Sequence, residues 1–126
     1  MASISAADDD ADIRAVVLRA LMRAGHTVTM VGDGAALVAK VRAELPDVVL
    51  TDNEMPAMTG LQAIRMLRDD PETADIPVVL ASGSVSRSEA MNTLHDGDQF
   101  VSKPFTPGQL RDGVDAALRS TRTDAG

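Results

Sequence analysis

The sequence predicts an α/β protein built on a doubly wound, five-stranded parallel sheet. Short apolar segments of strand length alternate along the chain with longer segments whose apolar residues recur every three or four positions. Two short segments, residues 48–50 and 78–80, both read Val-Val-Leu and do not alternate with polar residues, which is typical of central strands covered on both faces. Right-handed crossovers between successive strands then place helices on both faces of the sheet, in the flavodoxin-like strand order 2-1-3-4-5.

Five strands follow from these apolar segments. They are expected at residues 4–7, 27–31, 48–51, 78–81 and 99–102. The first is expected to be slight and weakly held, because Ser5, Ala6 and Ala7 have little β propensity.

Each strand is followed by a segment with the apolar spacing of a helix. The apolar stripes are Ile13, Val16, Val17, Ala20 and Leu21; Leu37, Val38, Val41 and Leu45; Leu61, Ile64 and Leu67; and Leu110, Val114, Ala117 and Leu118. The fourth helix, within residues 86–94, has the thinnest stripe. The sequences TGLQ at 59–62, SRSE at 86–89 and TPGQ at 106–109 each predict a capping box at a helix start.

Length and composition bound the class of protein. The chain of 126 residues is expected to form one domain over residues 1–126, with a core at about 4–120, a short polar tail at 121–126 and no output domain after it. A net charge of -7 and the lack of Trp and Tyr disfavour direct binding of nucleic acid. The absence of cysteine, of a signal peptide and of a long apolar segment predicts a cytoplasmic protein without a membrane span.

Polar side chains cluster at the carboxyl ends of the predicted strands. Asp8 and Asp9 follow the first strand, Asp52 the third, Ser82 the fourth and Lys103 the fifth. In a doubly wound parallel sheet the carboxyl ends of these strands form one edge, and ligands bind there. The sequence therefore predicts one site that contains all five side chains.

The residue types at this edge fit a hard cation beside a phosphoryl group. Mg²⁺ takes one or two protein carboxylates and completes its octahedron with water and phosphate oxygens, whereas a zinc site would need cysteine or clustered histidine. Lys103 is suited to pair with phosphoryl charge, and Ser82 to donate a hydrogen bond to a phosphoryl oxygen. Asp52 is then a candidate nucleophile.

Four motifs together resemble the response-regulator receiver domain of bacterial two-component signalling. They are DDD at 8–10, PDVVLTDNEMPAMTG at 46–60, IPVVLASG at 76–83 and FVSKPF at 100–105. They occur in the family's order and spacing, and the resemblance covers roughly residues 4–120. It points to a single-domain regulator of a phosphorelay, a phosphoacceptor that catalyses its own phosphorylation and dephosphorylation without independent substrate turnover.

The resemblance assigns roles to the phosphorylation site. Asp52 would accept a phosphoryl group from a histidine kinase or a histidine phosphotransfer protein. Asp9 and Asp52 would ligate Mg²⁺ directly, with the backbone carbonyl of Glu54 as a third ligand and Asp8 acting through water. The same resemblance implies that Lys103 pairs with the phosphoryl group.

It also implies a switch. Ser82 would move toward the phosphoryl group, and Phe100 occupies the aromatic switch position. A cis bond is implied between Lys103 and Pro104. Phosphorylation would shift the face made by the fourth helix, the fifth strand and the fifth helix, to which an unidentified downstream protein would bind.

Other polar residues have plainer interpretations. Asp10 and Asp12 are expected to open the first helix, where the positive end of the helix dipole favours carboxylates. His26 and His95 are interpreted as surface residues near helix ends. Glu54 and Ser84 are hypothesised to alter how fast the acyl phosphate hydrolyses.

Two rival functions stay open on the sequence. A receiver-like interaction module would bind partners without being phosphorylated, but the full set of Asp8, Asp9, Asp52, Ser82 and Lys103 speaks against it. A phosphohydrolase with an aspartyl-phosphate intermediate would need a further acid or base and a cap over its substrate, and the chain has no obvious room for either.

Overall fold

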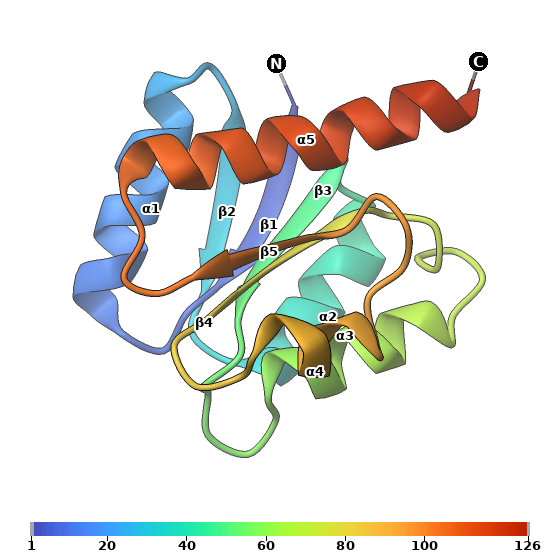
Figure 1. Ribbon diagram of the computed structural model, residues 1–126, viewed down its shortest axis with the longest axis horizontal. Helices are drawn as coiled ribbons and strands as arrows, with labels where there is room; N and C mark the ends of the chain where they lie inside the picture. The colour runs from blue at the N-terminus through green and yellow to red at the C-terminus, as the bar shows by residue number, and fades with distance from the viewer. Residues whose placement is uncertain (1, 126) are drawn as a thin grey trace.

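The predicted parallel sheet is confirmed, with its strands in the predicted order. The computed structural model describes the backbone of residues 2–125 and the side chains of residues 2–120. Within that part of the chain the sheet has the order β2-β1-β3-β4-β5 (Figure 1). Its strands are β1 (Ser3–Ala7), β2 (Thr27–Val31), β3 (Val48–Asp52), β4 (Val78–Ser82) and β5 (Gln99–Ser102).

Helices cover both faces of the sheet, as doubly wound topology requires. They are α1 (Ala11–Arg23), α2 (Gly34–Glu44), α3 (Gly60–Arg68), α4 (Arg87–Met91) and α5 (Pro107–Ala125). Figure 1 shows α1 and α5 on one side of the sheet and α2, α3 and α4 on the other. Each side has its own hydrophobic cluster.

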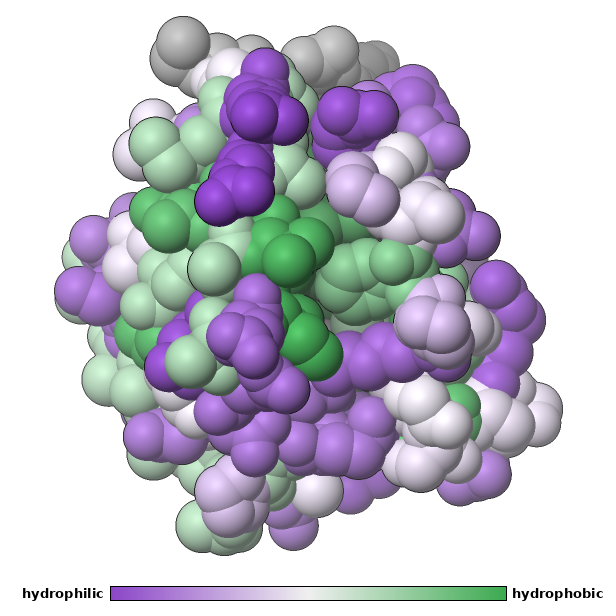
Figure 2. All heavy atoms as spheres, turned by 90° about the vertical axis from the view of Figure 1, so that its left-hand side faces the viewer, coloured by the Kyte–Doolittle hydropathy of each residue, from purple (hydrophilic) through white to green (hydrophobic). Residues whose placement is uncertain are grey.

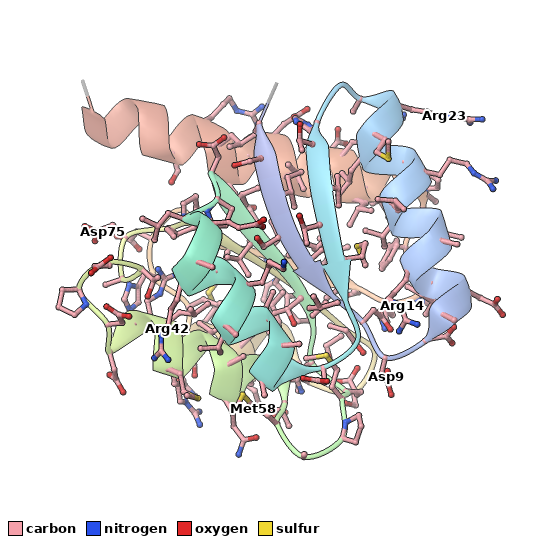
Figure 3. The ribbon with its side chains drawn as sticks, turned by 180° about the vertical axis from the view of Figure 1, so that it is seen from behind. Asp9, Arg14, Arg23, Arg42, Met58 and Asp75 are labelled. Carbon is pink, nitrogen blue, oxygen red and sulfur yellow. The ribbon has the colours of Figure 1, made fainter. Side chains whose placement is uncertain are left out.

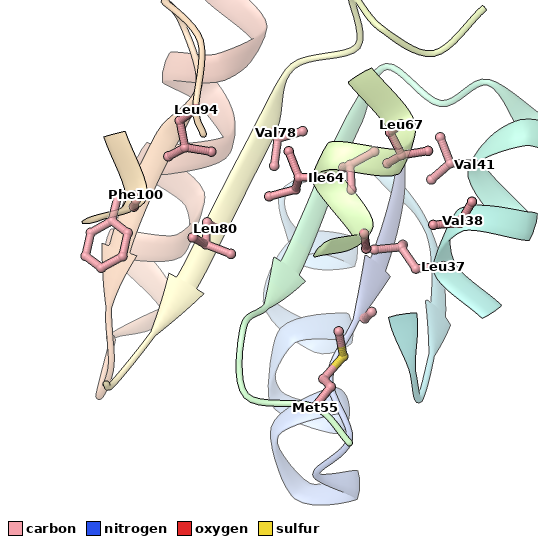
Figure 4. Close-up of a cluster of buried hydrophobic side chains, with 14 residues drawn as sticks. Leu37, Val38, Val41, Met55, Ile64, Leu67, Val78, Leu80, Leu94 and Phe100 are labelled. Carbon is pink, nitrogen blue, oxygen red and sulfur yellow. The ribbon is translucent and has the colours of Figure 1, made fainter. Parts of the chain in front are cut away.

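The two clusters share the central strands by alternation. Val49 of β3 points into the cluster of α2, α3 and α4, whereas its neighbours Val48 and Leu50 point into the cluster of α1 and α5. Successive strand side chains point to opposite faces, so a strand covered twice needs apolar residues at every position. Figure 4 shows the first cluster, in which Leu37, Ile64, Leu67 and Leu80 lie among the other labelled residues.

The expectation of a slight first strand is wrong. β1 has five residues, and it lies between β2 and β3, with parallel pairing to both. Ile4, Ala6 and Ala7 are buried. Hydrogen bonding on two edges and burial on two faces outweigh the low intrinsic β propensity of Ser and Ala, which is a weak and context-dependent preference.

The predicted helix starts have the expected caps. At Thr59 the side chain accepts from Gln62 N–H at 3.1 Å and the Gln62 side chain accepts from Thr59 N–H at 2.8 Å, which completes the capping box. The box at 106–109 is equally complete. At Ser86 the hydroxyl accepts from Glu89 N–H at 3.2 Å, but Glu89 bonds to the Ser86 hydroxyl instead of the backbone, so this box is only half formed.

Other details of the helices differ from expectation. Leu45 does not belong to the buried stripe of α2, because it caps the helix in the left-handed region at φ 47° and is 48% exposed. Val16 of α1 is also 48% exposed. The fifth helix extends to Ala125, beyond the expected end at residue 120, since neither Gly nor Pro interrupts residues 114–125.

Candidate functional site

The carboxylates predicted to share one sheet edge do come together. Oxygen atoms of Asp8, Asp9 and Asp52 all lie within 4.8 Å of one another. Asp8 and Asp9 follow β1, and Asp52 is the last residue of β3, one position further than the predicted strand end. Asp8 and Asp52 are buried, while Asp9 is exposed. The fold thus concentrates negative charge where two adjacent parallel strands end.

Lys103 supplies the counter-charge. Its Nζ lies 2.8 Å from Oδ1 of Asp52 and 3.2 Å from Oδ2 of Asp8. Burial raises the pKa of Asp52 above its ordinary value; Lys103 opposes this rise, and the charge of Asp8 adds to it. Burial alone would lower the pKa of Lys103, but the hydrogen bond and charge of Asp52, with Asp8, raise it. The lysine is therefore held as an ammonium ion between two carboxylates.

Local contacts fix the Asp8 end of the cluster. Oδ1 of Asp8 accepts a hydrogen bond from the N–H of Asp10 at 2.9 Å, and the Asp8 carbonyl accepts from the guanidinium of Arg14 at 2.8 Å. Figure 3 shows Asp9 and Arg14 at this same edge of the molecule. The side chain of Asp10 caps α1, because it accepts hydrogen bonds from the N–H groups of Asp12 and Ile13. This agrees with the prediction that Asp10 opens the first helix. Sequence reasoning missed Arg14, because nothing in its spacing distinguishes it from the solvent-facing arginines of α1.

Asn53 is a second residue that sequence reasoning missed. It is buried; its N–H donates to Ala81 O at 2.9 Å, and its side-chain oxygen accepts from Leu61 N–H at 3.0 Å. Gly60 packs against the backbone of Asp52 so closely that a Cβ there would collide with it. These contacts tie the loop after β3 to β4 and α3. The available signal was the polar pair Asn-Glu directly after Asp52.

Ser82 and Glu54 are joined by a short hydrogen bond. Oγ of Ser82, the last residue of β4, donates to Oε2 of Glu54 at 2.6 Å and accepts from the N–H groups of Ser84 and Val85. Glu54 also accepts from Gly83 N–H at 3.1 Å and Ser84 Oγ–H at 2.9 Å. Burial alone would raise the pKa of Glu54, but these hydrogen bonds outweigh it and lower the pKa. The Glu54 side chain thus belongs to the loop after β4.

Phe100 lies apart from the carboxylates. Its ring is buried in the cluster of α2, α3 and α4, and the guanidinium of Arg87 on α4 stands 5.6 Å from the ring centroid. A cation at this distance over an aromatic face is attracted to it.

The implied cis bond between Lys103 and Pro104 is present.

The donor set fits a hard divalent cation. Oδ1 of Asp52 is buried, and its partner among the described residues is Nζ of Lys103 at 2.8 Å, an ammonium that it shares with Asp8. Buried carboxylate oxygens need such a partner, and three converging carboxylates prefer a small oxygen-seeking cation. This edge of the sheet can therefore hold both a cation and an anionic group beside Lys103.

Residues 4–115 match the family described as the response regulator receiver domain. The chain belongs to this family. The receiver is thus a phosphoacceptor signalling module and not an enzyme with substrate turnover, and its acidic cluster of Asp8, Asp9 and Asp52 is consistent with that class.

The receiver is similar to curated response regulators of mycobacteria. It is 33% identical over 113 residues to the DNA-binding response regulator MtrA of Mycobacterium tuberculosis, covering 89% of this chain and 48% of that protein. It is 33% identical over 122 residues to the response regulator MprA of Mycobacterium leprae, covering 96% of this chain and 53% of that protein. The receiver thus spans about half the length of the curated relatives it matches.

Among solved structures, the receiver is similar to the chemotaxis response regulator CheY4 of Vibrio cholerae. The two superpose with a TM-score of 0.84 at 29% identity, over 94% of this chain and 99% of that one.

Within residues 2–125, no helix combines the length and the apolar character needed to cross a lipid bilayer.

Proposed function

We propose that this receiver accepts a phosphoryl group on Asp52 from a histidine kinase or a histidine phosphotransfer protein. The observation that carries the proposal is the geometry at Asp52: its Oδ1 is buried, lies 2.8 Å from the ammonium of Lys103 and sits within the acidic cluster. A nucleophilic carboxylate needs a cationic environment that offsets the charge of the incoming phosphoryl group.

In the proposed step an Asp52 carboxylate oxygen attacks phosphorus. The bond from phosphorus to the donor's imidazole nitrogen breaks, that nitrogen keeps the electron pair and takes a proton from solvent water, and an acyl phosphate forms on Asp52. Lys103 then pairs with the phosphoryl oxygens as a compact ammonium ion, released in part from Asp8 and Asp52.

Mg²⁺ is the cation that this donor set favours. Asp9 and Asp52 would hold it directly, together with the backbone carbonyl of Glu54, and Asp8 would act through water. When bound, the ion supplies charge neutralisation for the phosphoryl group in transfer. Asp8, fixed by Asp10 N–H and by Arg14, orients the cluster.

An apolar surface beside the site is the proposed docking area for the phosphoryl donor. Ile13 and Val16 of α1 line a hollow with Lys103, Pro104 and Phe105. Figure 2 shows hydrophobic residues gathered on this side of the molecule, with polar residues around them. A donor bound here would reach the phosphorylation edge over Lys103. We expect Val16→Glu to slow phosphotransfer from a phosphorylated kinase about tenfold while leaving phosphorylation by acetyl phosphate unchanged.

Output is proposed to pass through the face made by α4, β5 and α5. Ser82 Oγ anchors the N–H groups of Ser84 and Val85, so a Ser82 that turns toward a phosphoryl group releases the loop leading to α4. On α4 the Arg87 guanidinium covers Phe100, which makes the aromatic residue sensitive to movement of this helix. A downstream protein that reads this movement would distinguish the two states.

We further propose that residues 1–126 act as one receiver domain in the cytoplasm, through protein partners. The superposition on CheY4 supports one receiver domain over these residues, because it covers 94% of this chain and 99% of that one. The net charge of -7 supports protein partners over nucleic acid.

The proposed function is tested by incubation with acetyl phosphate and Mg²⁺, followed by intact-mass measurement. Wild type is expected to gain one labile phosphoryl group, and Asp52→Asn none. No gain in wild type at saturating Mg²⁺ would support the rival interaction module that is not phosphorylated. Equal gain in both proteins would refute Asp52 as the acceptor.

A further inference from the structure

The carboxylate of Glu54 accepts hydrogen bonds from the loop after β4. It accepts from Ser82 Oγ–H at 2.6 Å, Gly83 N–H at 3.1 Å and Ser84 Oγ–H at 2.9 Å, and also from the side-chain amide of Asn53 at 3.1 Å. Three of these four donors belong to consecutive residues at the end of β4. The hydrogen-bond donors with which this loop could bind an anion are therefore already bound to the Glu54 carboxylate.

A hydroxyl has a single proton to donate. Ser82 gives its proton to Glu54, while its lone pairs accept from Ser84 N–H at 3.2 Å and Val85 N–H at 2.9 Å. All of its hydrogen-bonding capacity is therefore used within the loop. Ser82 cannot donate to a phosphoryl oxygen on Asp52 unless it first leaves Glu54.

We propose that Glu54 is an internal competitor of the phosphoryl group for Ser82, and that it holds the loop after β4 in its resting arrangement. This inference rests on the proposed function, since it takes Asp52 as the phosphoryl acceptor. Glu54 lies two residues beyond Asp52, so the competitor is carried by the loop that directly follows the acceptor. Phosphorylation alone then switches only the fraction of molecules in which Glu54 has released Ser82.

Two substitutions separate this competition from simple charge repulsion. Glu54→Ala removes both the charge and the hydrogen bonds. Glu54→Asp keeps the charge, but its side chain is one methylene shorter and does not reach Ser82 and Gly83 together. Glu89→Gln is the matched control, because Glu89 is a carboxylate on α4 that bonds to Ser86 and not to Ser82.

The probe is beryllium trifluoride, a phosphoryl analogue, titrated by calorimetry at saturating Mg²⁺. We expect it to bind Glu54→Ala and Glu54→Asp about tenfold more tightly than wild type, since charge-assisted hydrogen bonds no longer have to be given up. Glu89→Gln is expected to bind within twofold of wild type. Binding of Glu54→Asp within twofold of wild type would overturn the competition, whatever Glu54→Ala does.

A second measurement needs no phosphoryl analogue. Hydrogen exchange of the Gly83 amide in the unphosphorylated protein is expected to be about tenfold faster in Glu54→Ala than in wild type, because the acceptor of that N–H is lost. An unchanged exchange rate would overturn the resting contact. If wild type fails to bind the analogue, the proposed function fails and the competition fails with it. If wild type and both Glu54 variants bind it equally, the competition alone fails.

Discussion

The ammonium of Lys103 lies 2.8 Å from Oδ1 of Asp52, and the same nitrogen is 3.2 Å from Oδ2 of Asp8. One cation from the loop after β5 thus bridges carboxylates that follow β1 and end β3. The side chain of Lys103 is 18% exposed, that of Asp52 is 2% exposed and that of Asp8 is 6% exposed. Charges that are this well shielded from water interact more strongly than surface pairs, so removing the cation has a predictable cost.

Lys103→Met is expected to destabilise the metal-free protein by about 2 kcal/mol, because it leaves two buried carboxylates without their cation. Saturating Mg²⁺ is expected to recover most of this loss, since it offers the carboxylates another cation. Urea unfolding with and without Mg²⁺ measures both effects. Lys40→Met on α2 is the control and should change neither value by more than about 0.5 kcal/mol. A stable Lys103→Met without Mg²⁺ would contradict the assigned pairing.

Binding of Mg²⁺ should depend on Asp9 and not on its acidic neighbour Asp12. A ligand at 100 times its dissociation constant stabilises the folded state by about 2.7 kcal/mol. We expect Mg²⁺ at this concentration to stabilise wild type and Asp12→Asn by about this amount, which is measured as a rise in the thermal midpoint. Asp9→Asn is expected to lose most of this rise. Equal stabilisation of the two variants would place the cation elsewhere.

The raised pKa of Asp52 has a consequence for stability. A carboxyl group whose pKa is higher in the folded than in the unfolded protein costs stability once pH rises through the ordinary Asp value toward the folded value. Without metal, Asp52→Asn should therefore be more stable than wild type at neutral pH by about 1 kcal/mol, or roughly 4 °C. The difference should shrink as pH falls below the ordinary pKa of Asp.

Thermal unfolding across this pH range measures the effect of Asp52→Asn. Exposed Asp12→Asn is the control and should show no comparable pH-dependent gain. A destabilised Asp52→Asn at neutral pH would mean that Lys103 outweighs the burial of the carboxylate.

Ala57, in the loop between β3 and α3, adopts φ 67°. Residues with a Cβ are disfavoured in this left-handed region by about 1 kcal/mol. Ala57→Gly is therefore expected to raise the free energy of unfolding by about 0.5–1 kcal/mol. Ala39→Gly, within α2, should lower it by about 1 kcal/mol. A loss of stability in both variants would contradict strain at Ala57.

The carboxylate cluster could be predicted from the sequence because strand ends in a parallel sheet share an edge. Asp8, Asp9, Asp52 and Lys103 each follow or end an apolar segment, and spacing alone places them together. The role of Glu54 could not be predicted in this way. Three of its four hydrogen-bond donors lie 28–30 residues further on, and which hydroxyl a side chain reaches depends on the conformation of two loops.

The wrong prediction of a slight first strand has a different cause. Intrinsic propensity underestimates Ser5, Ala6 and Ala7, because pairing with β2 on one side and β3 on the other stabilises the backbone whatever its side chains. Local preference is least informative in the centre of a sheet.

The most direct test of the central claim locates the phosphoryl group on the chain. After reaction with acetyl phosphate and Mg²⁺, borohydride reduces an aspartyl phosphate to homoserine, which peptide mass spectrometry assigns to a position. Homoserine at position 52, absent when Mg²⁺ is withheld, is the result that acceptance by Asp52 predicts. Homoserine at position 8 or 9, or none in a protein that has gained a phosphoryl group, would contradict it.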